Sequence, residues 1–170
     1  MEDKLETILK HVNDWLKFAE QKNATLLALD AGTIWGVSKL LNDTSTETNI
    51  VFILSSTGYF FLIVSIAICL TAFMPVLTNV WFKCGDKNTT DNALYFGDIA
   101  KYTPSEYLAF LRNKLRKKSS VLEWELDYSN QITNNASIAL EKYKRYTLAS
   151  WFFFIAMMVF LFAIGIKYIG

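Results

Sequence analysis

The sequence predicts an all-α integral membrane protein with three transmembrane helices, a helical cytoplasmic region and a long last helix that continues into the membrane. Charged residues make up 19% of the 170 residues, yet none lies in 48–82 or in 146–166. Each uncharged segment reaches the roughly 20 residues that a helix needs to cross a hydrocarbon core. The remaining residues carry the charge density of a soluble surface. The chain is therefore divided between membrane and water.

The first predicted span, 24–41, has about the minimum length and contains charged residues. Asp30 alone costs a few kcal/mol at the centre of a span, so a re-entrant or interfacial helix is the alternative. Small residues recur every fourth position, which is typical of close helix pairing in a bilayer: Ala28, Gly32 and Gly36. An acid inside a membrane is a functional hypothesis by default, although a marginal span leaves open that Asp30 reaches water.

The second and third spans, 50–77 and 146–169, are clear from their apolar composition. Met74-Pro75 is expected to stop or kink the second span, because proline lacks an N–H and strains the preceding turn. Trp151 and Tyr168 stand where aromatic belts lie at the membrane surfaces.

The distribution of Lys and Arg predicts the orientation of the spans. Residues 1–23 hold four, the connector 42–49 holds none, and 83–145 holds eleven. Because positive residues stay on the cytoplasmic side, we expect the N-terminus and 78–145 in the cytoplasm, Cys84 included. The connector and the C-terminus then face the opposite side. The charged N-terminal helix is unlike a signal peptide.

The cytoplasmic region is predicted to be helical. Apolar residues recur at helical spacing through residues 1–23, and no Gly or Pro interrupts this amphipathic helix before Gly32, so it can run directly into the first span. Thr103-Pro104-Ser105-Glu106 is a capping box that begins another helix, which carries a basic cluster at 112–118. From Ser120 onward a seam with alternating spacings of four and three predicts contact with a partner helix: Leu122, Leu126, Ser129, Thr133, Ala136, Leu140 and Tyr143. We expect subunit contacts along it.

The composition excludes several classes of protein. One His and two Cys, with fourteen residues between the cysteines, cannot form a zinc site of the CxxC or HExxH type or a disulfide scaffold. A net charge of +1 provides no field that would attract nucleic acid. The chain has no Gly-rich phosphate loop after a strand and no nucleophile with a histidine at suggestive spacing. We therefore expect neither an enzyme nor a cofactor.

Several motifs together resemble the transmembrane effector family of Pycsar antiphage systems, whose domain also occurs in related cyclic-oligonucleotide defence systems. The resemblance covers nearly the whole chain. It rests on Trp15-x-x-Phe18-Ala19-x-x-Lys22, Pro75, Tyr95-Phe96-Gly97-Asp98-Ile99-Ala100 with Glu106-Tyr107-Leu108, and the run from Gln131-Ile132 through Asn134-Asn135 and Ile138-Ala139 to Lys142-Tyr143.

The resemblance implies a self-associating effector of the bacterial inner membrane that impairs membrane integrity and stops or kills the infected cell. Its cytoplasmic region would be the sensor of a cyclic nucleotide made by a neighbouring nucleotide cyclase, with cUMP or cCMP favoured. The runner-up interpretation is a constitutive helical membrane scaffold that binds a protein partner and no small ligand. A transporter is disfavoured, because the three spans show no inverted repeat.

Six residues are the candidates for ligand binding on this hypothesis: Tyr95, Phe96, Asp98, Arg112, Lys142 and Tyr143. Aromatic rings can stack on a nucleobase, and cations can hold its phosphate. Each has a structural alternative: Tyr95 and Phe96 as core side chains, Asp98 as part of a helix start, and Arg112 as part of a solvated or headgroup-binding helix face. For Lys142 and Tyr143 the alternative is a snorkelling lysine and an interfacial tyrosine.

Overall fold

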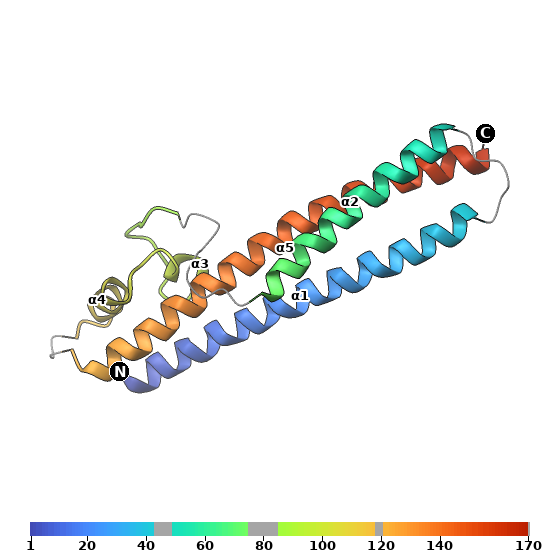
Figure 1. Cartoon of the computed structure of the whole chain (residues 1–170). Helices are drawn as coiled ribbons and strands as arrows, with labels where there is room; N and C mark the ends of the chain where they lie inside the picture. The colour runs from blue at the N-terminus through green and yellow to red at the C-terminus, as the bar shows by residue number, and fades with distance from the viewer. Residues whose placement is uncertain (43–48, 75–84, 118–120, 170) are drawn as a thin grey trace. The chain divides into compact units, whose positions relative to one another are not determined.

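A computed structural model describes residues 1–42, 49–74, 85–117 and 121–169 of the chain, and these form five helices without a strand (Figure 1). They are α1 (Glu2–Asn42), α2 (Asn49–Phe73), α3 (Phe96–Ile99), α4 (Pro104–Lys114) and α5 (Glu123–Ile169). By length and composition α1, α2 and α5 can each cross a membrane. The predicted all-α fold with three spans and a long last helix is confirmed.

Helices α1 and α5 are continuous over 41 and 47 residues. Each has acidic residues in its first turn and a lysine in its last, which complements the helix dipole. The amphipathic N-terminal helix therefore does run directly into residues 24–41. Pro75, Cys84, the connector residues 43–48 and the end of the basic cluster at Lys118 lie outside the described residues.

The chain divides into two compact units, and α1 and α5 contribute to both. One, here called the polar unit, consists of Met1–Glu20 and Val76–Lys144. The other, here called the membrane unit, consists of Gln21–Pro75 and Arg145–Gly170.

The polar unit has a core of ordinary soluble type, in which large apolar side chains point inward. Helices α1, α3, α4 and α5 all supply it, and among its buried members are Leu5, Val12, Phe96, Ile99, Tyr107, Leu111, Ile132 and Ala136. The predicted capping box is present at the start of α4, where the Thr103 amide donates to the Glu106 carboxylate over 2.9 Å. The buried Tyr107 hydroxyl donates to the Ala93 carbonyl over 2.8 Å, which ties α4 to the segment before α3.

The middle of the predicted seam on α5 packs within the chain. Ala136 belongs to the same core as Leu5 and Val12 of α1, and the Ser129 hydroxyl donates to the Pro104 carbonyl over 2.5 Å. The expectation that this part of the seam contacts another subunit is therefore wrong. Heptad-like spacing shows that a helix has a partner, but it does not show that the partner belongs to a second copy.

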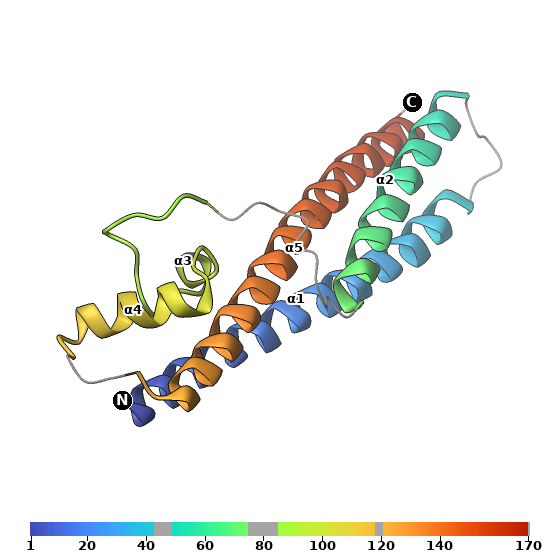
Figure 2. The same ribbon diagram turned by 60° about the vertical axis from the view of Figure 1, so that its left-hand side comes forward.

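In the membrane unit, α2 lies beside the second halves of α1 and α5 (Figures 1 and 2). The side chains of this unit are distributed differently from those of the polar unit. Larger apolar residues such as Leu62 and Phe160 are buried in its interior. Small residues are frequent there as well, among them Gly58, Ser65, Cys69, Ala149, Ala156 and Ala163. Many large apolar side chains point outward; Trp35, for example, is 70% exposed. The Phe160 ring packs directly on Gly58, where an added Cβ would lie 2.6 Å from it.

The stripe of small residues on α1 faces outward. Ala28 and Gly32 are exposed, and a Cβ added at Gly32 or Gly36 would meet nothing within 4 Å. The stripe is therefore not used to pack the helices of this chain against one another. Its use in pairing with a second copy stays a prediction.

Two cations of α5 contact the C-terminal ends of the other membrane helices. Arg145 donates to the Thr71 carbonyl near the end of α2, and Lys167 donates to the Leu41 carbonyl near the end of α1. Helix α2 has no basic residue in its own last turn, so Arg145 supplies the positive charge that a helix C-terminus favours.

Candidate functional site

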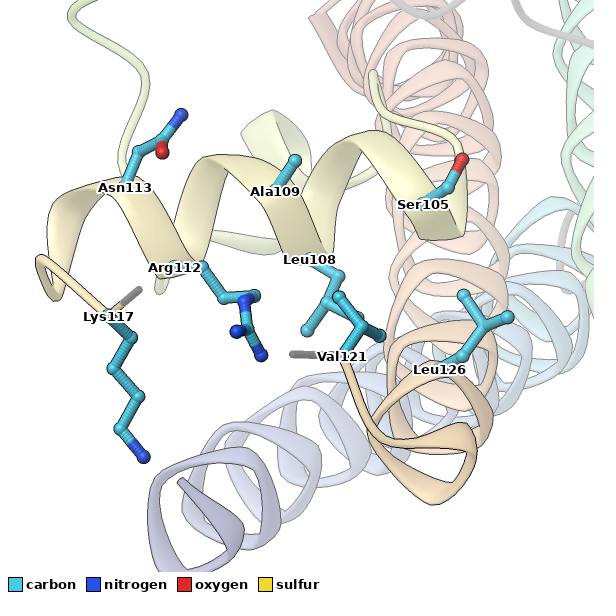
Figure 3. A pocket seen from close by; sticks show the side chains of 8 residues that line it. All are labelled: Ser105, Leu108, Ala109, Arg112, Asn113, Lys117, Val121 and Leu126. Carbon is cyan, nitrogen blue, oxygen red and sulfur yellow. The ribbon is translucent and has the colours of Figure 1, made fainter. Parts of the chain in front are cut away.

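The polar unit contains a pocket between α4 and the start of α5, here called the α4–α5 pocket (Figure 3). Its volume is about 530 Å³, within the range of small-molecule sites. It combines an apolar wall with polar and charged groups, and its lining residues are Ser105, Leu108, Ala109, Arg112, Asn113, Lys117, Val121 and Leu126. Arg112 and Lys117 extend to the same side of α4 (Figure 3).

Arg112 is held by a buried ion pair. Its guanidinium donates to the Glu125 carboxylate over 2.6 Å, and the two side chains are 8% and 5% exposed. The pair joins α4 to α5 and neutralises the Arg112 charge. Lys117 is exposed at the rim, so it is the cation better placed to meet an anionic ligand. The pocket therefore offers a surface for a flat apolar group beside the positive charge of Lys117, whereas the Asn113 side chain points to the other side of α4 (Figure 3).

A second feature is an aromatic cluster around Phe96. The Phe96 ring stacks on Tyr143 with a centroid distance of 5.1 Å and an interplanar angle of 20°. Trp15 and Tyr95 lie 5.5 and 4.8 Å from the same ring. Phe96 is buried, whereas Trp15 and Tyr95 are about half exposed. Burial, together with the neighbouring Tyr95, raises the pKa of the Tyr143 phenol.

The stacking surface of Phe96 is thus already in contact with protein rings. A nucleobase reaching this cluster would meet Tyr95 and Trp15 first. A shallow hollow of about 390 Å³ adjoins it, lined by His11, Asp14, Trp15 and Phe18.

Asp98 belongs to an ion-pair network that holds the loop before α3 and α4. Lys101 pairs with Asp91 at 2.8 Å and with Asp98 at 2.6 Å. The other oxygen of Asp98 accepts a hydrogen bond from the Asn92 amide. The hydrogen bond from the Asn88 amide, and to a smaller extent the one from Lys101, lowers the pKa of Asp91 to about 2. The carboxylate of Asp98 is therefore engaged in local structure.

Lys142 is also paired within the polar unit. Its ammonium lies 2.7 Å from the Glu20 carboxylate, and the lysine side chain is 8% exposed while the glutamate side chain is 48% exposed. The pair links α1 to α5. Lys142 could meet a phosphate only by exchanging this carboxylate for the ligand.

The structure brings three of the six predicted residues together: Tyr95, Phe96 and Tyr143 form the aromatic cluster with Trp15. Arg112 lines the α4–α5 pocket, whose lining includes none of the other five. Asp98 and Lys142 are occupied by ion pairs. Their assignment to a ligand stays a prediction.

The sequence alone does not single out the apolar wall of the pocket or Glu125. Val121 and Leu126 look like ordinary helix residues in the sequence, and Leu126 was assigned to the seam. Only the return of α5 beside α4 makes them face Arg112. The basic cluster at 112–118 was the one local signal for this site.

These features define a helical membrane protein whose polar unit carries a pocket with an apolar wall and an exposed lysine at its rim. Residues 4–169 match PycTM, the Pycsar effector protein domain. The chain belongs to this family, which makes it a Pycsar antiphage defence effector. No curated protein and no solved structure matches the chain.

Proposed function

We propose that the protein senses a cyclic nucleotide with its polar unit and, in response, disrupts the integrity of the bacterial inner membrane. The infected cell then stops growing or dies. The membership in the Pycsar effector family carries this proposal, and three helices able to cross a membrane support it. On the positive-inside rule the N-terminus and residues 78–145 face the cytoplasm, where a neighbouring cyclase would release the nucleotide.

The α4–α5 pocket is the site that best suits such a ligand. Leu108, Val121 and Leu126 provide an apolar surface for a base, and Lys117 provides a cation for the phosphate. A cyclic mononucleotide carries a single negative charge. One exposed cation, Lys117, is therefore enough to balance the charge of its phosphate. The family resemblance favours a cyclic pyrimidine, cUMP or cCMP.

The shared helices suggest how binding acts on the membrane. Helix α5 supplies Glu125 and Leu126 to the pocket region and also runs through the membrane unit. A ligand shifts a conformational equilibrium only by binding one arrangement more tightly than the other. A ligand that favours one placement of α5 beside α4 therefore favours one arrangement of the helix that crosses the membrane.

Ligand-dependent thermal stabilisation tests the sensing step. Purified protein in mild detergent is heated with cUMP, cCMP, cAMP or cGMP, and we expect a pyrimidine nucleotide to raise the melting temperature. Lys117→Gln should lower the affinity for this nucleotide about tenfold or more, as expected when a charge-assisted hydrogen bond is lost. Lys10→Gln, an exposed lysine of the same unit that does not line the pocket, should have no effect.

The same assay separates the pocket from the aromatic cluster and from the scaffold alternative. If Tyr95→Ala weakens binding and Lys117→Gln does not, the nucleotide binds at the cluster. If no nucleotide of the panel stabilises the protein, sensing is contradicted and the scaffold interpretation is favoured.

Dye release from lipid vesicles tests the membrane step. Vesicles that contain the protein should release a trapped dye only when the stabilising nucleotide is present on the side of the bilayer that the polar unit faces. Protein that binds the nucleotide yet leaves the vesicles sealed would contradict membrane disruption.

Orientation is tested in intact cells. In a chain without its native cysteines, Ser45→Cys should react with an impermeant thiol reagent, whereas a chain that keeps only Cys84 should not. The reverse labelling pattern would overturn the proposed orientation.

A further inference from the structure

One acidic side chain is buried among the three helices of the membrane unit. Asp30 of α1 is fully buried, as are Ser65 of α2 and Ala149 of α5 beside it. The Ser65 hydroxyl lies 2.9 Å from Asp30 Oδ2 and 3.2 Å from the Ala149 carbonyl oxygen. The second carboxyl oxygen, Oδ1, has no hydrogen-bond partner within the part of the chain that the structure describes. A single polar contact therefore joins all three helices.

The two distances fit a neutral carboxylic acid better than a carboxylate. A hydroxyl has one proton to donate. If Asp30 is ionised, Ser65 donates to it, and the approach of Ser65 to the Ala149 carbonyl is then not a hydrogen bond. If Asp30 carries a proton on Oδ2, it donates to Ser65 Oγ, and Ser65 donates to Ala149. Both distances are then hydrogen bonds.

The surroundings of Asp30 also oppose a charge. Leu26, Cys69 and Ala149 form one apolar cluster there. From α2 the titratable neighbour is the Cys69 thiol, and from α5 the neighbour is a backbone carbonyl. The cations of the unit contact other groups: Lys22 and Lys39 lie over the Tyr146 and Trp35 rings, and Arg145 and Lys167 donate to the Thr71 and Leu41 carbonyls. An unpaired buried carboxylate is strongly disfavoured in such a site.

We propose that Asp30 is an intramembrane proton-binding site, neutral in this structure, whose proton holds the three helices of the membrane unit together. Loss of the proton leaves a charge for which the Ser65 hydroxyl is the one donor seen among the described residues, so the remaining solvation has to come from water. Ionisation of Asp30 therefore opens the contact between α1, α2 and α5 to water. This inference concerns the membrane unit alone and does not depend on a nucleotide in the polar unit.

A hydrophobic carbodiimide tests the neutral state by direct chemistry. The acid adds to dicyclohexylcarbodiimide: its proton moves to a reagent nitrogen, its oxygen bonds to the central carbon, and an acyl shift to nitrogen gives a stable N-acylurea with no leaving group. The full chain is treated in lipid vesicles at about pH 8, where carboxyl groups in water are ionised. We expect the peptide with Asp30 to gain one reagent mass, and Asp30→Asn to remove this product.

A water-soluble carbodiimide is the matched control and should leave Asp30 unmodified. Equal modification by both reagents would place Asp30 in water and overturn the proposal. Absence of modification by the hydrophobic reagent would overturn it as well. The comparison of the two carbodiimides uses the unaltered chain, so it remains decisive if Asp30→Asn fails to fold.

Cys69 provides a native reporter of opening, because it is fully buried in the same cluster. In a Cys84→Ser background, its reaction with N-ethylmaleimide is followed from about pH 6 to about pH 10. The thiol itself reacts faster at high pH, so each rate is divided by that of the Asp30→Asn protein, whose side chain stays neutral. We expect this ratio to rise about tenfold or more across the range. A flat ratio would overturn the proposed opening.

Two serine variants test whether the three-helix contact is specific. Ser65→Ala removes the hydroxyl between Asp30 and Ala149, and we expect Cys69 to react severalfold faster at neutral pH. Ser38→Ala is the matched control, because it removes a hydroxyl of the same unit that lies 2.9 Å from the Tyr59 hydroxyl. An equal increase in both variants would show general loosening and contradict the role of Ser65.

Discussion

The polar unit and the membrane unit are built on the same two long helices, yet they distribute their side chains in different ways. The polar unit buries large apolar and aromatic residues and pairs its charges, as in Arg112–Glu125 and Lys142–Glu20. The membrane unit buries many of its glycine, alanine, serine and cysteine residues beside a few large ones such as Leu62 and Phe160, and it exposes many of its Trp, Phe and Leu side chains. Water drives the first arrangement. In lipid that force between helices is absent, so close packing and hydrogen bonds dominate.

One continuous helix therefore packs in two different ways along its length. Along α5, Ile132 and Ala136 are buried in the polar unit, whereas Trp151 and Phe162 are exposed in the membrane unit. The same type of substitution should therefore have different consequences in the two units.

The largest expected effect is on the buried ion pair of the polar unit. Arg112→Ala leaves the Glu125 carboxylate buried without its cation, which typically costs about 3–5 kcal/mol. Thermal unfolding in detergent should show a large drop in melting temperature. The double variant Arg112→Met/Glu125→Leu should recover much of it. A melting temperature of Arg112→Ala close to the wild type would show that the pair does not hold α4 to α5.

Lys87 provides the matched control for that experiment. Its pair with Glu106 is 2.7 Å long, close to the 2.6 Å of Arg112–Glu125, but both of its side chains are nearly half exposed. Lys87→Ala should leave the melting temperature unchanged, because solvent screens exposed ion pairs.

The next effect tests the packing of small residues in the membrane unit. Gly58→Ala places a methyl group against the buried Phe160 ring, and overpacking of this kind costs about 1–3 kcal/mol. Gly32→Ala is the control, since nothing lies within 4 Å of the added group. Thermal stability in detergent measures both. Equal stability of the two variants would contradict the contact between α2 and α5.

A smaller effect concerns the outward stripe on α1. If Ala28, Gly32 and Gly36 pair with a second copy, Gly32→Leu should reduce self-association in vesicles, measured by energy transfer between labelled copies, by roughly 1 kcal/mol. The thermal stability of the single chain should not change. Unaltered energy transfer would assign self-association to another surface.

The smallest effect is local and depends on pH. Asp91 has a pKa of about 2 in the folded chain, below the value of about 3.9 for an unstructured chain. The contribution of Asp91 to the free energy of unfolding is therefore present above about pH 4 and is lost as the pH falls toward 2. The amide resonance of Asn88, which donates to Asp91 over 2.9 Å, should shift in that window. The Asp91→Asn protein should not show this transition.

The sequence predicts well what depends on local pattern. The three spans follow from hydropathy, the unbroken α5 from the absence of a helix breaker, and the start of α4 from the capping box. The partner of α5 was misjudged, because the spacing around Ser129 and Ala136 is the same whether the partner lies in the same chain or in another.

The partners of charged residues were also beyond prediction. Arg112 and Asp30 were singled out, but Glu125 and Ser65 were not, since each meets its partner only through the relative rotation of two packed helices. No local pattern encodes that rotation. Tyr95 and Phe96 were predicted as either ligand contacts or core residues, and the structure shows one of each kind of environment: Tyr95 is half exposed and Phe96 is buried.

The contacts of Arg145 and Lys167 fix the depth at which α5 can lie in a bilayer. At a rise of about 1.5 Å per residue the two positions are about 33 Å apart along the helix, close to the hydrocarbon thickness of about 30 Å. Both cations also hold the carbonyl ends of neighbouring helices, so α5 cannot slide along its axis without breaking one of these bonds. A thicker bilayer would draw a cation into the acyl chains, and a thinner one would strip lipid from the apolar surface between them. We therefore expect the thickness of the bilayer to influence the arrangement of the membrane helices.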